Sequence, residues 1–187
     1  MIQVGIIAVK PPESLVPLLS DKQRVAWRTI ETALDLEQVN GIIIFTEKAL
    51  ELEERFNKLK LVKALTEKLL AGTPLWLMGA GFLLFQKNNY NSPLALLDVT
   101  ATKANYPAEF TKGIYIQALD TNKIMVKFYS TPWIAKVDPH VGVMSRDQHK
   151  ITMVRQGNIL VSVFVPGAGD NKLVPYFLAM ITENLNK

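Results

Sequence analysis

The stretch Gly72-Thr-Pro-Leu-Trp-Leu-Met-Gly-Ala-Gly-Phe-Leu-Leu-Phe85 decides how this chain folds. Residues 74–78 form an apolar run of strand length, typical of a strand buried on both faces of a parallel sheet. Gly79-Ala-Gly81 interrupts the run, and residues 82–85 continue as a helix-like apolar stretch. A strand, a sharp turn and a helix in this order predict an α/β sheet, whose ligands bind at the carboxyl ends of the strands.

The flanking sequence repeats this alternation. We expect strands at residues 4–9, 25–30 and 41–45, a short helix at 13–21 and a longer helix at 48–70. The periodicity of the longer helix predicts a buried face made of Leu50, Leu59, Val62, Leu65 and Leu69. Later strands are expected at 113–119, 124–129, 142–145, 151–155 and 159–165, before an amphipathic helix at 175–185. The pattern predicts one three-layer α/β domain over residues 1–187, with a mainly parallel sheet and additional antiparallel strands.

Composition excludes several chemistries. The 187 residues contain no cysteine, which rules out disulfides, thiolate metal sites and cysteine nucleophiles. The net charge of +4 is spread along the chain, so we expect no nucleic-acid partner. No apolar run reaches the roughly 20 residues that cross a bilayer, and the N-terminus lacks a signal-peptide pattern. We therefore expect a cytoplasmic protein without a membrane partner, and we expect no cofactor and no metal.

Two segments of the sequence resemble a known family. Residues 72–85 and Val154-Arg-Gln-Gly-Asn-Ile-Leu-Val-Ser-Val-Phe-Val-Pro166 resemble the PdxT/SNO family, and shorter likenesses occur in the family's order at 4–9, 39–44, 96–99 and 128–134. Members of that family are the glutaminase subunits of pyridoxal 5′-phosphate synthase. The resemblance implies a class I glutamine amidotransferase-like, flavodoxin-like fold and a context in vitamin B6 biosynthesis. It also implies that the partner is a PdxS-like synthase.

The catalytic residues of such a glutaminase are absent. A family member attacks the amide with a cysteine thiolate, which a histidine activates and a carboxylate orients. The resemblance places the cysteine position at Gly79, the histidine position at Val165 and the carboxylate position at Gly167. We therefore expect no glutaminase activity. Glycine at the turn also relieves strain, which costs a residue with a side chain about 1–3 kcal/mol.

The former oxyanion and substrate cleft is expected to contain Thr46, Glu47, Ala80, Lys103, Ser130 and Trp133. The oxyanion-side loop of the family falls on residues 45–49, which are bulkier than the family's glycines. Among the tryptophans, Trp133 is expected in the cleft and Trp76 in the core. The chain also departs from the family at residues 9–12, a region that in the family helps to contact the synthase.

Other polar residues give weaker signals. His140 and His149 show no metal-ligand spacing and are expected at surface or structural positions. Asp147 and His149 lack a nearby nucleophile, and no Gly-x-Ser-x-Gly elbow exists. Residues 167–171 are interpreted as a turn and helix cap, with an anion cradle as the alternative.

Two functions fit a retained fold with an erased site. The first is a catalytically inactive binding or regulatory subunit, linked to pyridoxal 5′-phosphate biosynthesis through a PdxS-like synthase or acting on another protein. The alternative is a sensor that binds an apolar or aromatic small molecule in the remodelled cleft. An active glutaminase contradicts the absence of cysteine. A closed cleft would favour the protein partner, and an open apolar cleft would favour the ligand.

Overall fold

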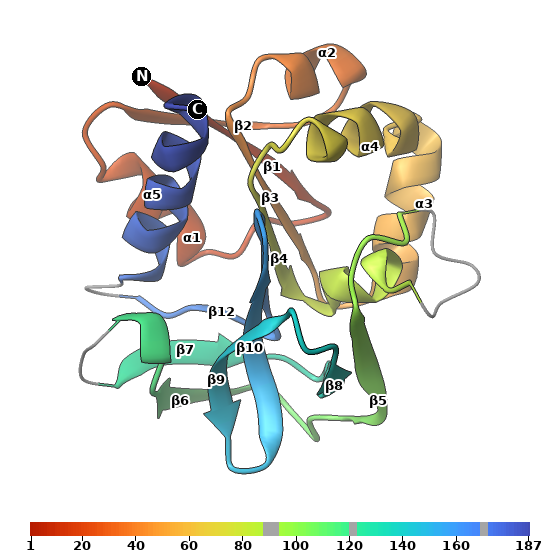
Figure 1. Cartoon of the computed structure of the whole chain (residues 1–187), viewed down its shortest axis with the longest axis vertical. Coiled ribbons are helices and arrows are strands. Elements are labelled where there is room, and N and C mark those ends of the chain that lie inside the picture. The colour runs from red at the N-terminus through yellow and green to blue at the C-terminus, as the bar shows by residue number, and fades with distance from the viewer. Residues whose placement is uncertain (88–93, 120–122, 169–171) are drawn as a thin grey trace.

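Figure 1 shows the computed structural model, which describes residues 1–87, 94–119, 123–168 and 172–187. The α-helices are α1 (Leu15–Ser20), α2 (Ala33–Glu37), α3 (Ala49–Leu59), α4 (Val62–Leu70) and α5 (Leu173–Leu185). Two short 3₁₀ helices are η1 (Ala80–Phe85) and η2 (Gln117–Leu119). The strands are β1 (Ile2–Ala8), β2 (Val25–Thr29), β3 (Gly41–Thr46), β4 (Leu75–Gly79), β5 (Val99–Asn105), β6 (Phe110–Ile114), β7 (Ile124–Phe128), β8 (Pro132–Val137), β9 (Gly142–Asp147), β10 (Lys150–Gln156), β11 (Ile159–Ser162) and β12 (Phe164–Pro166).

A nine-stranded sheet forms the centre of the molecule. Its order is β2-β1-β3-β4-β11-β10-β8-β5, with β9 paired to β10. The strands from β2 to β11 are parallel, and the remaining pairs are antiparallel. β3 and β4 are buried along their whole length, as expected for unbroken apolar runs that are covered on both faces. The predicted combination of a parallel sheet with additional antiparallel strands is confirmed.

Helices cover both faces of the parallel strands. Figure 1 shows α1 and α5 on one face, and α3 and α4 on the other. Leu15 and Phe177 are fully buried on the first face, and Leu52 and Phe56 are fully buried on the second. These side chains join the strands in one continuous apolar core, so the predicted three-layer α/β architecture is confirmed.

The single helix predicted at residues 48–70 is in fact two helices. Lys60 adopts a left-handed conformation with φ 52° and ends α3, and α4 begins at Val62. The predicted buried face is wrong at Leu50, which is 65% exposed, whereas Leu52 and Phe56 face the core. The error arises because the break at Lys60 changes the phase of the apolar positions, which a single helical period cannot represent.

A second sheet has the order β12-β7-β6. Its inner face is aromatic, with Phe110 stacked on Phe128 at 4.8 Å between ring centroids and Phe164 edge-on to Phe128 at 5.5 Å. The strands predicted at 113–119 and 159–165 need correction. The first ends at Ile114, and the second is divided at Val163 between the two sheets. An apolar run alone does not show where a chain passes from one sheet to another.

Three elements are missed by the sequence analysis. The short helix α2 starts at a capping box, in which the Thr32 side chain accepts from the Asp35 amide and Asp35 accepts from the Thr32 amide. β5 and β8 lie at the far end of the main sheet and lack an unbroken apolar run. Within the described ranges, none of the helices is both long and apolar enough to cross a membrane.

Candidate functional site

Gly79 forms a sharp turn between β4 and η1. Its backbone angles are φ 63° and ψ −130°, in a region that residues with side chains rarely adopt. A Cβ atom at this position would lie 2.4 Å from the Thr46 carbonyl oxygen and 3.3 Å from Phe45 Cε2. Glycine is therefore the residue that fits here without movement of the neighbouring backbone.

Thr46 fills the space beside this turn. β3 and β4 are parallel neighbours, and Thr46 is the register partner of Gly79. The Thr46 hydroxyl donates to the Lys48 carbonyl at 2.7 Å and accepts from the Lys48 amide at 3.1 Å. This local turn holds the loop after β3 with a carbonyl oxygen close to residue 79. An oxyanion is stabilised by hydrogen-bond donors, and a carbonyl oxygen is an acceptor.

Val165 and Gly167 lie on and just after β12, which packs against β4. Val165 is almost fully buried and is the register partner of Lys127 on β7. The Gly167 amide donates to the Met125 carbonyl at 3.0 Å. A Cβ at residue 167 would lie 2.6 Å from that carbonyl oxygen. The backbone of β7 therefore leaves no space for a carboxylate side chain at this position.

The other predicted cleft residues are scattered. Ala80 is buried at the start of η1, beside Gly79. The Ser130 hydroxyl donates to the Tyr106 carbonyl at 2.8 Å. Lys103 and Trp133 lie on β5 and β8, which β11 and β10 separate from β4 in the main sheet. The structure does not bring these two residues to the turn at Gly79.

Trp133 is the tryptophan that we predict in the cleft. Its ring packs against Tyr106 at 5.4 Å between centroids, with Lys150 Nζ 4.4 Å from the Trp133 centroid. The aromatic residues that line an open groove near the turn are Phe45 and Tyr129. A signal for Tyr129 exists in the sequence, because residues 127 and 129 alternate with the buried Val126 and Phe128.

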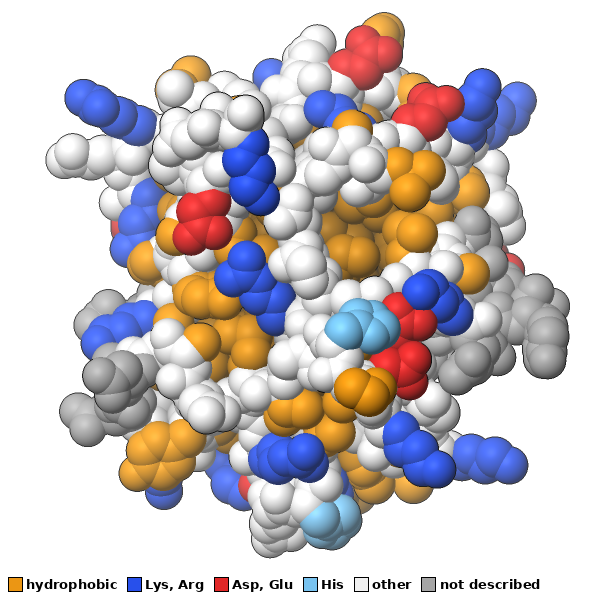
Figure 2. All heavy atoms as spheres, viewed as in Figure 1, with side chains coloured by type: hydrophobic (Ala, Val, Ile, Leu, Met, Phe, Trp, Pro, Cys, Tyr) orange, Lys and Arg blue, Asp and Glu red, His pale blue; other side chains and the backbone are white. Residues whose placement is uncertain are grey.

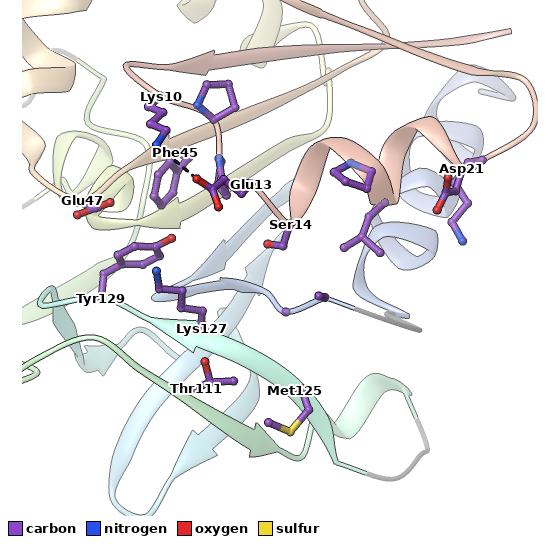
Figure 3. A pocket seen from close by; sticks show the side chains of 17 residues that line it. Lys10, Glu13, Ser14, Asp21, Phe45, Glu47, Thr111, Met125, Lys127 and Tyr129 are labelled. Atoms are coloured by element: carbon purple, nitrogen blue, oxygen red, sulfur yellow. Dashed lines mark hydrogen bonds and ion pairs between the residues drawn. The ribbon is translucent and has the colours of Figure 1, made fainter.

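This groove has a volume of about 1000 Å³ and lies between the segment that leads into α1 and the outer face of β6 and β7 (Figure 3). Its lining includes Glu47 and Gly167 from the predicted site, but not Gly79, Thr46 or Val165. Figure 2 shows the face of the molecule seen in Figure 1, on which hydrophobic side chains gather in patches bordered by charged side chains. Backbone atoms thus fill the space beside Gly79, and a neighbouring groove is open.

Lys127 and Tyr129 form the polar centre of this groove. Lys127 Nζ lies 2.8 Å from Glu109 Oε2 and 4.7 Å from the centroid of the Tyr129 ring. The hydrogen bond with Glu109 raises the pKa of Lys127, against the opposing effect of burial. Burial raises the pKa of Tyr129, and the nearby carboxylates of Glu47 and Glu109 act in the same direction. At neutral pH the groove therefore contains a lysine cation and a neutral tyrosine hydroxyl.

Comparison with known proteins decides the family. The model of the SNO glutamine amidotransferase family matches residues 19–183. The chain belongs to the SNO glutamine amidotransferase family. Among solved structures, a glutamine amidotransferase superposes on this SNO family chain with a TM-score of 0.80 at 19% identity, covering 96% of this chain and 98% of the other. A glutamine amidotransferase from Thermotoga maritima gives a TM-score of 0.60 at 12% identity, covering 99% and 84%. These likenesses show the shared fold.

Relatives of this SNO family chain are named "Pyridoxal 5'-phosphate synthase subunit PdxT". The protein from Carboxydothermus hydrogenoformans is 28% identical over 80% of this chain and 82% of its own length. The protein from Fervidobacterium nodosum is 30% identical over 82% and 84%. The protein from Clostridium botulinum is 25% identical over 98% and 100%. The likeness therefore covers between 82% and 100% of the length of these relatives.

The remaining predicted polar residues lie elsewhere in this SNO family fold. His140 Nε2 lies 3.0 Å from Asp98 Oδ2. The same oxygen accepts hydrogen bonds from Lys87 Nζ at 2.6 Å and from Gln156 Nε2 at 2.9 Å. His149 is exposed, and Asp147 pairs with Lys112. No group of three or more potential metal ligands occurs within the described part of the chain. The anion cradle considered at 167–171 falls partly on residues 169–171, which lie outside the described residues.

Proposed function

We propose that this chain is a catalytically inactive glutamine amidotransferase homologue that acts by binding a protein. Membership of the SNO family supports the ancestry, and the absence of cysteine supports the loss of the family's nucleophile. The partner that the relatives suggest is a PdxS-like synthase, because those relatives are named as subunits of pyridoxal 5′-phosphate synthase. The role would be that of a non-catalytic or regulatory subunit.

The contact between Thr46 and Gly79 carries this proposal. The Thr46 carbonyl oxygen occupies the space that a nucleophile's Cβ would need, at 2.4 Å from the ideal Cβ position. Protein interiors yield little to such an overlap when the neighbouring atom belongs to the backbone. A second backbone carbonyl, that of Met125, closes the space at Gly167. The site therefore lacks the catalytic groups, and backbone oxygens occupy the space for two of the three.

The catalytic half of the proposal is tested by glutamine hydrolysis. We expect no ammonia release by the purified protein above a heat-inactivated control, either alone or with a PdxS-like synthase. We expect the same of Gly79→Cys and of the triple variant Gly79→Cys, Val165→His, Gly167→Glu, because Thr46 and Met125 still block the site. Hydrolysis by the unmodified chain would overturn the proposal. Hydrolysis by Gly79→Cys alone would show that Thr46 does not close the site.

The binding half is tested by recovery of partners from the native cell extract. A tagged wild-type chain is expected to retain a PdxS-like synthase or another defined protein, identified by mass spectrometry and then reconstituted from purified components. Size-exclusion chromatography with light scattering should then show a stable complex of the two purified proteins. Failure of every recovered protein to bind in purified form would contradict this half of the proposal.

A second function is supported by the open groove. Its volume of about 1000 Å³ lies at the upper end of the range common for small-molecule sites. Phe45, Tyr129, Pro12 and Met125 give it apolar surface near Gly167, beside six charged side chains. Such a groove supports a sensor that binds a small organic molecule, in which the ligand lies beside the filled nucleophile position.

A further inference from the structure

The charges around the groove balance. Its lining contains three basic residues and three acidic residues, which are Lys10, Lys22, Lys127, Glu13, Asp21 and Glu47. Lys10 pairs with Glu13 at 3.5 Å, and Lys127 pairs with Glu109 at 2.8 Å. A charged ligand would thus meet both signs of charge at close range, and neither an anion nor a cation gains a net attraction. The charge pattern favours an uncharged ligand.

Tyr129 supplies a directed polar group. The residue is 6% exposed, and its ring packs against Phe45 at 5.4 Å between centroids. Figure 3 shows its hydroxyl turned into the groove, next to the Lys127 ammonium. Lys127 Nζ lies 4.7 Å from the centroid of the Tyr129 ring, and an ammonium group has no acceptor for the proton of the hydroxyl. A neutral tyrosine hydroxyl can donate that proton in a hydrogen bond.

The groove also offers apolar surface. Met125 is 50% exposed although it lies on a strand whose other face is in the core. Pro12 and Leu18 contribute to the opposite wall, on the segment that leads into and includes α1. Exposed apolar side chains that face a concave surface commonly mark a binding site.

We propose that this groove binds an uncharged organic molecule with an aromatic or other apolar body and one hydrogen-bond acceptor, which receives the proton of the Tyr129 hydroxyl. The apolar body lies between Met125 and the Pro12 wall. Lys127 lies over the tyrosine ring and is held there by its ion pair with Glu109. The proposal rests on the second candidate function, that of a small-molecule sensor.

Three probes of nearly equal shape test the charge preference. 2-Phenylacetamide is neutral, phenylacetate is an anion and phenethylamine is a cation. Each is titrated into ¹⁵N-labelled full-length protein, and amide shifts report both the affinity and the place of binding. We expect 2-phenylacetamide to bind with a dissociation constant on the order of 1 mM, as suits so small a molecule. The charged analogues should bind several-fold more weakly, with shifts at the same residues.

Paired tyrosine variants test the anchor. Tyr129→Phe should weaken binding of 2-phenylacetamide about 3- to 10-fold, as expected for the loss of one hydrogen bond. Tyr115→Phe is the matched control, because Tyr115 also has a lysine over its ring but is 63% exposed and does not line the groove. Tyr115→Phe should leave the affinity unchanged.

Several results would overturn the proposal. These are the absence of saturable shifts in the groove with the neutral probe, tighter binding of either charged probe, or equal affinity in wild type and Tyr129→Phe. A folded ¹⁵N spectrum of Tyr129→Phe shows that any loss of affinity is not due to unfolding. Glutamine hydrolysis and partner recovery are measured separately, so failure of the ligand proposal does not alter the result for the inactive-subunit proposal.

Discussion

Replacement of Gly79 by alanine measures how tightly the turn after β4 is closed. The new Cβ would sit 2.4 Å from the Thr46 carbonyl oxygen, well inside van der Waals contact. The oxygen belongs to the backbone of a strand that pairs with both β1 and β4, so it cannot turn away as a side chain would. The alanine must therefore displace the end of β3 or the turn itself.

The expected cost has two parts. Holding a residue with a side chain at φ 63° and ψ −130° costs about 1–3 kcal/mol. Forcing an additional methyl group into a filled interior costs about 1–3 kcal/mol more. We therefore expect Gly79→Ala to lower the free energy of unfolding by about 2–6 kcal/mol, a large part of the about 5–15 kcal/mol that stabilises a typical domain.

Equilibrium unfolding in urea at pH 7 measures this loss, and Gly157→Ala is the control. Gly157 also has a positive φ, 56°, but a Cβ there would meet nothing within 4 Å. That variant should lose only the conformational cost of a left-handed residue, about 1–2 kcal/mol. Equal losses in the two variants, or a smaller loss at Gly79, would refute the claim that Thr46 closes the site.

Two further predictions concern the charge of Asp98 and the termination of α3. Burial acts to raise the pKa of Asp98, but hydrogen bonds from Lys87 and His140 outweigh it, so its pKa lies below the usual value. A lowered folded-state pKa gives stability that is present above the unfolded pKa of about 3.9 and is lost as the pH falls through the folded value. Asp98→Asn should therefore lower stability at pH 7 and flatten its fall between about pH 5 and pH 2, as measured by urea unfolding at several pH values. Lys60→Gly should raise the thermal midpoint of unfolding, because glycine removes about 1 kcal/mol of strain at a left-handed position. Lys58→Gly, inside α3, should lower the midpoint, because glycine costs a similar free energy within a helix. Midpoints that shift in the same direction in the two variants would contradict this reasoning.

The fold could be predicted from the sequence wherever apolar runs had strand length. Residues 41–45 and 74–78 are predicted correctly, because a buried parallel strand needs an unbroken apolar run. The break at Lys60 could not be predicted in this way, since a lysine in the left-handed region has no signature comparable to glycine. β5 and β8, at the end of the sheet, have mixed composition and show no clear period.

Only part of the candidate site could be predicted from the sequence in the same way. Glycine at residue 79 is visible in the sequence, but the position of the Thr46 carbonyl depends on how β3 ends and on the turn that the Thr46 hydroxyl makes with Lys48. The contacts of Trp133 could not be predicted for a similar reason, because adjacency to Pro132 does not specify which strand its ring will face. Tyr129 and Lys127 line the groove through the alternation of β7, and that signal was present but unused.

The two glycines whose Cβ positions are blocked give a stronger argument together than either gives alone. A site that had merely lost its side chains would keep the space that those side chains had occupied, and single substitutions would fit back into it. Here backbone carbonyl oxygens lie 2.4 Å and 2.6 Å from the ideal Cβ positions of Gly79 and Gly167. These oxygens belong to β3 and β7, in two different sheets. Regaining a nucleophile and a carboxylate would require changes to both sheets at once, which supports the proposed loss of glutamine hydrolysis.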